Sequence, residues 1–202
     1  MNQLQRYQLL ENWVKNQFPT RSFLLSPASA DASFRRYFRI EFSDKSAPKT
    51  LIVMDAPPEH EDCASFLYVA NIFSAANVHV PEILAKDLRQ GFLLLSDLGS
   101  TTYLESIGGS SSVAGDLYHD AIDALIRIQS ASCTGELPDY DEKLLLKELN
   151  LFPDWYLVKY LKVALDTNQK EELNNCFTKI INNNLAQPRV YVHRDFHSRN
   201  LM

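Results

Sequence analysis

The spacing of apolar residues changes near residue 99, and this change constrains the fold more than any other feature. Before that point, three runs with the composition of β-strands follow one another closely, at residues 23–26, 34–42 and 50–55. Two more such runs, at residues 83–85 and 92–96, come after a helical segment. Short connections between such runs indicate an antiparallel sheet. From residue 101 on, apolar residues recur at three- and four-residue spacing, which predicts helices.

Helices are also predicted before and within the sheet region. The N-terminal residues carry one apolar face from Leu4 to Phe18, and Pro19 follows the end of this helix. The acidic residues Glu59, Glu61 and Asp62 are expected to open a second helix, because carboxylates stabilise a helix N-terminus. In the second half, the helical segments are residues 101–107, 113–132, 143–151, 155–164 and 169–185, and a short strand is expected at 190–192.

This order of elements predicts an α+β protein with two lobes. Residues 1–98 are expected to form an antiparallel-sheet lobe with a long helix, and residues 99–202 a helical lobe. Residues 96–99 are the expected hinge between them.

The second strand-like run alternates along its length. Alternation places successive side chains on opposite faces of a sheet. One face is expected to carry Phe34, Arg36, Phe38 and Ile40, and the other Arg35, Tyr37, Arg39 and Glu41.

Composition excludes several classes of function. The net charge of −5 argues against nucleic-acid binding, which needs clustered basic residues. The longest strongly apolar run, residues 92–95, is far shorter than the roughly 20 residues that span a bilayer, and the N-terminus has no signal sequence, so no membrane association is expected. Cys63, Cys133 and Cys176 lack the spacing of a disulfide framework or zinc site, and we expect buried, reduced thiols in a cytoplasmic protein.

The chemistry is concentrated in the last residues, where the pattern H-R-D-x-x-x-x-N covers residues 193–200. Phosphoryl transfer to a hydroxyl needs a carboxylate beside the nucleophile and metal ions beside the phosphates. Asp195 is the candidate catalytic base and Asn200 the candidate metal ligand, with His193 holding the loop. The alternative is an ordinary loop with a structural histidine.

Four segments together carry a family resemblance: residues 31–39 (DASFRRYFR), 54–59 (MDAPPE), 94–99 (LLSDLG) and 193–202 (HRDFHSRNLM). They resemble the aminoglycoside phosphotransferase/choline kinase family, whose fold is protein-kinase-like with two lobes. More narrowly, the chain is similar to bacterial kinases that phosphorylate N-acetylmuramate and N-acetylglucosamine at the anomeric hydroxyl in cell-wall recycling. The resemblance implies ATP and Mg²⁺ as cofactors and a small sugar as acceptor.

The resemblance also implies a nucleotide site in the first hundred residues. Ser29, Ala30 and Ser33 match the turn that covers the phosphates, although this turn has no glycine. Ser96, Asp97 and Leu98 match the hinge, whose backbone groups bind the nucleobase.

The phosphate-binding lysine of the third strand is absent, and Met54 or Asp55 stands in its place. Arg36 or Arg39 is expected to supply the missing positive charge, because a guanidinium binds phosphate well. Glu59 or Glu61 matches the glutamate that normally pairs with the lysine, or else only stabilises its helix. Arg199 is a candidate contact to phosphate or substrate, or a packing residue.

By resemblance, the aspartate that is the main magnesium ligand follows Asn200 in a further strand pair. The chain stops at Met202. We therefore expect a fragment of a longer kinase, with an incomplete helical lobe and little or no activity alone.

Two other functions are compatible with the sequence. One is an aminoglycoside (antibiotic) phosphotransferase, in which the acceptor is a polycation. The other is a non-catalytic, pseudokinase-like binding remnant, which the absent lysine favours.

Overall fold

A computed structural model describes residues 2–30, 34–44, 46–108 and 111–202 of the chain. Its centre is a five-stranded sheet in the order β1-β2-β3-β5-β4, with every neighbouring pair antiparallel. The predicted antiparallel sheet is therefore confirmed. The strands are β1 (Phe23–Ala30), β2 (Arg36–Phe42), β3 (Thr50–Asp55), β4 (Ile83–Asp87) and β5 (Phe92–Ser96).

Helices precede, interrupt and follow these strands. Asp62 opens the second helix as predicted, because it is the N-cap and accepts a hydrogen bond from the Ala64 N–H at 2.8 Å. The prediction is wrong for Glu59 and Glu61, which precede the helix. The helices are α1 (Gln3–Gln17), α2 (Cys63–Ala75), α3 (Tyr103–Ile107), α4 (Ser111–Ser130), α5 (Glu142–Leu149), the π-helix η1 (Phe152–Tyr160) and α6 (Thr167–Leu185).

Two predictions for the second half are also wrong. Residues 155–164 are not one helix, because η1 ends at Tyr160 and an irregular segment follows. Residues 190–192 form no strand, since no described residue pairs with them in a ladder.

The contacts divide the chain into two compact units. The first unit contains residues 1–128 and 195–202, and the second contains residues 129–194. The predicted hinge lies within the first unit. The division into lobes at residue 98 stays a prediction.

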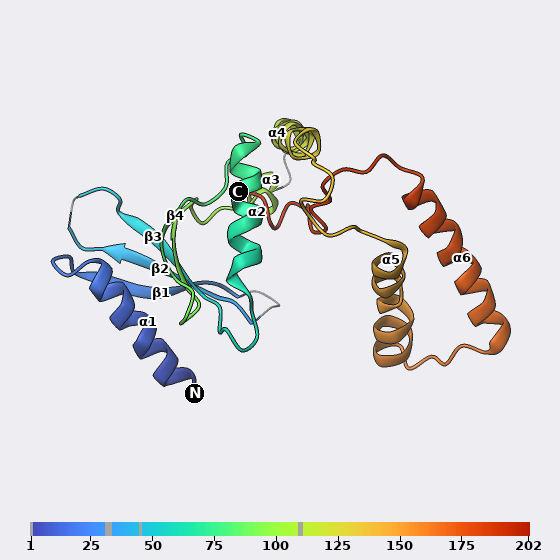
Figure 1. Cartoon of the computed structure of the whole chain (residues 1–202), viewed down its shortest axis with the longest axis horizontal. Helices are drawn as coiled ribbons and strands as arrows, with labels where there is room; N and C mark the ends of the chain where they lie inside the picture. Colours follow the sequence, from blue (N-terminus) through green and yellow to red (C-terminus); the bar gives the residue numbers. More distant parts are fainter. Residues whose placement is uncertain (1, 31–33, 45, 109–110) are drawn as a thin grey trace. The chain divides into compact units, whose positions relative to one another are not determined.

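Each face of the sheet has its own core cluster, and a different helix packs on each (Figure 1). Leu10 and Val14 of α1 pack on Val53 and Phe92, and all four are fully buried. On the other face, Cys63 of α2 lies in a second cluster. Its other members are Met54, Ala56, Leu93 and Leu95. The alternation along the strands therefore decides which helix each side chain meets.

The α1 face also holds a buried charge. Asp55 is fully buried and accepts hydrogen bonds from Nε of Arg6 at 2.8 Å and from Nε of Arg36 at 3.1 Å. Arg6 is itself buried, and its Nη2 donates to the Gln90 carbonyl at 2.6 Å. Two guanidinium groups on one carboxylate satisfy the hydrogen-bonding needs of the buried charge.

Of the three cysteines, Cys63 is buried, whereas Cys133 and Cys176 are exposed, so the expectation of buried thiols holds only for Cys63. In the described part of the chain, no helix combines the length and the apolar character that crossing a lipid bilayer requires.

Substituting Asp55→Ala should cost about 3–5 kcal/mol of the free energy of unfolding, because it leaves Arg6 buried without a counter-charge. Urea denaturation followed by circular dichroism measures this loss. The control is Asp44→Ala, which removes the exposed partner of Arg21 and should cost much less. Equal losses in the two variants would contradict a buried ionic anchor at Asp55.

Candidate functional site

The C-terminal loop brings Asp195 and Asn200 together, as their spacing in the sequence predicts. Nδ2 of Asn200 donates to Oδ2 of Asp195 at 2.6 Å and to its backbone carbonyl at 3.0 Å. Nε2 of His197 lies 3.0 Å from Oδ1 of Asp195. The Arg199 N–H donates to Nδ1 of the same imidazole at 3.2 Å, which assigns the ring proton to Nε2. The exposed carboxylate of Asp195 thus has one donor on each oxygen.

The same loop is fixed to the start of α3. The carbonyls of Leu201 and Ser198 accept hydrogen bonds from the backbone N–H groups of Tyr103 and Leu104, at 2.8 and 3.0 Å. Thr102 and Glu105 form a capping box that satisfies the neighbouring N–H groups. The loop therefore uses helix donors that would otherwise need water.

His193 and Arg194 belong to the second unit. His193 is half-buried, and its predicted role of holding the loop stays a prediction. Arg194 has a positive φ of 71° and donates to the carboxylate of Glu148, which also accepts from the Tyr140 hydroxyl. These hydrogen bonds, that from Tyr140 foremost, lower the pKa of Glu148, and the carboxylate in turn raises the pKa of Tyr140.

The predicted hinge is held by an ion pair. Asp97 accepts from Nε and Nη2 of Arg39 at 2.7 and 3.1 Å and from the Gly99 N–H at 2.9 Å, while Arg39 also donates to the Gly99 carbonyl at 2.6 Å. Burial by itself would raise the pKa of Asp97, but hydrogen bonds from Arg39, Gly99 and Thr50 outweigh it and lower the pKa. The pair of Asp97 and Arg39 therefore fixes residues 97–99 to β2. Base binding by the backbone of Ser96, Asp97 and Leu98 stays a prediction.

Arg36 and Met54 lie on opposite faces of the sheet. Arg36 points to the α1 face, where Asp55 binds it, whereas Met54 is fully buried among the side chains beneath α2. The structure thus does not bring these two predicted nucleotide contacts together. Met54 offers no surface to a ligand, because it is part of the core.

A second arginine, which the sequence did not single out, lies on the face of Met54. Nε of Arg35 donates to Oε2 of Glu61, just before α2, at 3.0 Å, and its guanidinium carbon lies 5.9 Å from the centre of the Phe66 ring. The alternation of residues 34–42 predicts the face of Arg35. The alternation does not predict that Glu61 is the partner of Arg35.

The predicted phosphate-covering turn lies partly outside the described residues. Ser29 pairs with Tyr37 and Ala30 with Arg36 in the β1–β2 ladder, after an irregularity between Pro27 and Ser29. Ser33 lies outside the described residues.

A metal ion would find few protein ligands here. No group of three or more His, Cys, Asp or Glu side chains in the described ranges has the arrangement of a metal site. The side chain of Asn200 donates to Asp195 through Nδ2, and its amide oxygen is a hard ligand of the kind that Mg²⁺ prefers. Arg199 is exposed beside it.

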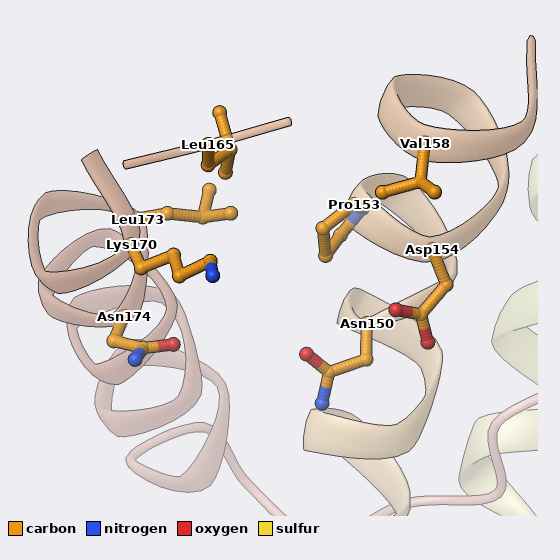
Figure 2. Close-up of a pocket in the computed structure, with 8 residues that line it drawn as sticks. All are labelled: Asn150, Pro153, Asp154, Val158, Leu165, Lys170, Leu173 and Asn174. Carbon is orange, nitrogen blue, oxygen red and sulfur yellow. The ribbon is translucent and has the colours of Figure 1, made fainter. Parts of the chain in front are cut away.

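The second unit contains a separate pocket of about 260 Å³, which lies between η1 and α6. Figure 2 shows Lys170, Leu173 and Asn174 on one side and Pro153, Asp154 and Val158 on the other. None of the lining residues is one that the sequence predicts for catalysis, nucleotide binding or metal binding.

Substituting Asp97→Asn should lower the stability of the first unit by about 1–3 kcal/mol near neutral pH, because a charged hydrogen-bond acceptor is lost. The stability that Asp97 supplies is complete above its unfolded-state pKa of about 3.9 and decreases as the pH falls toward the lower folded-state pKa. The difference between wild type and variant should therefore shrink below about pH 4.

Urea denaturation between pH 3 and pH 8 checks this. Asp123→Asn, an exposed carboxylate on α4, is the control and should change the curve little. A difference between wild type and Asp97→Asn that stays constant with pH would contradict the assigned role.

Comparison with known proteins identifies the family. The N-acetylmuramate/N-acetylglucosamine kinase of Pseudomonas aeruginosa is 51% identical over 178 residues, which are 88% of this chain and 51% of that protein. The proteins of the same name from Pseudomonas putida and Neisseria meningitidis serogroup B are 45% and 42% identical, over 88% and 98% of this chain and 51% and 59% of theirs. The chain thus spans about half the length of the Pseudomonas relatives. The sequence profile of the phosphotransferase enzyme family matches residues 25–202, and the chain therefore belongs to that family.

Proposed function

We propose that the whole protein is an ATP- and Mg²⁺-dependent kinase that phosphorylates a sugar hydroxyl. The relatives' names support N-acetylmuramate and N-acetylglucosamine as acceptors. The observation that carries the chemistry is the carboxylate of Asp195, exposed and held by one donor on each oxygen. We further propose that the phosphate goes to the anomeric hydroxyl. The protein would act in cell-wall recycling and lie in the cytoplasm.

In this reaction, Asp195 is the general base. Its carboxylate orients the acceptor hydroxyl and takes the proton, while the hydroxyl oxygen forms a bond to the γ-phosphorus of ATP. The bond from that phosphorus to the β,γ-bridging oxygen breaks, and ADP leaves with the electron pair. Asn200 keeps the carboxylate in place through its amide N–H.

The proposed nucleotide contacts come from the first unit. The backbone of residues 96–98 would hold the base, and Ser29, Ala30 and Ser33 the phosphate end, in the two-lobed arrangement of residues 1–98 and 99–202. The amide oxygen of Asn200 would be one ligand of Mg²⁺, which neutralises charge on the phosphate oxygens when bound. Further oxygen ligands would come from ATP, from water and from the aspartate that the resemblance places after Asn200.

A second candidate, a nucleotide-binding protein without turnover, is favoured by one observation. Asp55 and Met54 stand where the resemblance places the phosphate-binding lysine, and neither side chain carries a positive charge; both are also fully buried.

Substituting Asp195→Asn should lower kcat about 10²–10⁴-fold, because the proton acceptor is lost. The affinity for MgATP should change little. The measurement is phosphate transfer by the whole protein to N-acetylmuramate, N-acetylglucosamine and an aminoglycoside, assayed in parallel. The matched control is Asp123→Asn, an exposed carboxylate on α4 that should leave turnover unchanged.

Each outcome selects one function. Transfer to the sugars that is lost in Asp195→Asn supports the sugar kinase. Transfer to the aminoglycoside alone would make the protein an antibiotic-modifying enzyme. A rise in melting temperature with MgATP shows that the nucleotide binds. If no acceptor is phosphorylated in that case, the result would support a nucleotide-binding protein without turnover.

A further inference from the structure

We propose that Glu148 and Tyr140 are positioning residues for phosphoryl transfer, which act through Arg194 on the backbone that leads into Asp195. The inference rests on the proposed function, since Asp195 is the proposed general base. Arg194 directly precedes Asp195 and is the last residue of the second unit. Because the two residues share a peptide bond, a rotation of the backbone at Arg194 turns the start of the loop of residues 195–202.

The backbone of Arg194 has a conformation that is costly for this residue type. Its φ is 71°, in the left-handed region, where the Cβ of any residue except glycine crowds the backbone. A residue keeps such a conformation only where its surroundings favour it. The contacts of the Arg194 side chain can supply this support.

Glu148 binds the guanidinium of Arg194, and Tyr140 holds Glu148. Nη2 of Arg194 donates to Oε1 of Glu148, while the Tyr140 hydroxyl donates to Oε2. Each carboxylate oxygen thus has a donor, which fixes the orientation of the carboxylate. The guanidinium carbon of Arg194 also lies 5.7 Å from the centre of the Tyr140 ring, within the range of a cation–π interaction. Each of the three side chains therefore contacts the other two.

Both ends of α5 contribute to this set of contacts. Tyr140 directly precedes Asp141, the N-cap of α5, and Glu148 lies in the last turn of the helix. The helix dipole disfavours a negative charge in that turn, so Glu148 needs partners there. The hydrogen bond from Tyr140, and then the contacts of Arg194, lower the pKa of Glu148 against the effect of burial, so the carboxylate stays charged.

The alternative is an ordinary surface ion pair. The side chains of Arg194 and Glu148 are 53% and 34% exposed, and pairs as open as this contribute little to stability. Stability alone is therefore a weak reason for the pair. Orientation is a stronger one, because a misplacement of about 1 Å in a reacting group can lower the rate roughly 100-fold.

The test measures the steady-state kinetics of the whole protein with MgATP and N-acetylmuramate. Glu148→Gln should lower kcat about tenfold, because the charge that holds Arg194 is lost, while the KM for MgATP should change less than about twofold. Tyr140→Phe should lower kcat about threefold, since Glu148 then loses one donor but still binds Arg194. The melting temperature of each variant shows whether it is folded.

Arg194→Gly separates the effect of the side chain from that of the backbone. Glycine adopts a φ of 71° without strain, so this variant removes the guanidinium and keeps the conformation accessible. It should lower kcat about as much as Glu148→Gln, because glycine does not hold the backbone in one conformation. The double variant should be no slower than either single variant, as expected for residues that act as one unit.

Asp139→Asn is the matched control. Asp139 also lies just before α5 and forms an ion pair with an arginine of the C-terminal segment, Arg189, at 3.5 Å. Both side chains of this pair are largely exposed, and Arg189 is not adjacent to Asp195. The variant should leave kcat and the KM for MgATP unchanged. A loss of kcat as large as that of Glu148→Gln would contradict a specific role for Glu148.

Three further results would overturn the inference. The first is a wild-type kcat in Glu148→Gln, even with a lower melting temperature, as expected for a pair that only stabilises the fold. The second is a double variant in which the losses of Glu148→Gln and Arg194→Gly multiply. The third is a wild-type protein that transfers no phosphate to N-acetylmuramate or N-acetylglucosamine, and only this result would also remove the proposed function.

Discussion

The alternation of side chains along β2 is the constraint on which the rest of the first unit depends. It divides a basic segment between two faces of one sheet. Arg36 forms an ion pair with the buried Asp55 under α1, Arg35 with Glu61 just before α2, and Arg39 with Asp97 directly after β5. Each arginine therefore connects β2, or the residue before it, to a different part of the unit. A shift of one residue in register would exchange the faces and break all three ion pairs.

The candidate site combines two rigid supports. At one, the pair of Arg39 and Asp97 fixes residues 97–99 to β2. At the other, the loop of residues 195–202 rests on the first N–H groups of α3. Asn200 and His197 then hold the carboxylate of Asp195 from both sides. Such support is what a general base needs, because its reach to the acceptor proton must be reproducible.

The sequence predicts the parts of the fold that local pattern determines. The bounds of β3 and β5 agree with the prediction, since both are short apolar runs between turn residues. Of the three acidic residues expected to open α2, only Asp62 does so, as its N-cap, because a short side chain directly before the first turn can accept a hydrogen bond from that turn. The spacing within residues 193–200 predicted that Asp195 and Asn200 meet. The partner of Arg35 could not be predicted, because it depends on how α2 packs on the sheet, which no local pattern specifies.

The most direct test of the central claim is the ³¹P NMR spectrum of the whole protein incubated with MgATP and N-acetylmuramate. The account predicts a new resonance of a sugar phosphate at the anomeric position, which grows in step with ADP. A spectrum in which ATP stays intact, or yields only inorganic phosphate and ADP, would contradict a sugar kinase. A phosphate on another hydroxyl would keep the kinase and contradict the anomeric acceptor.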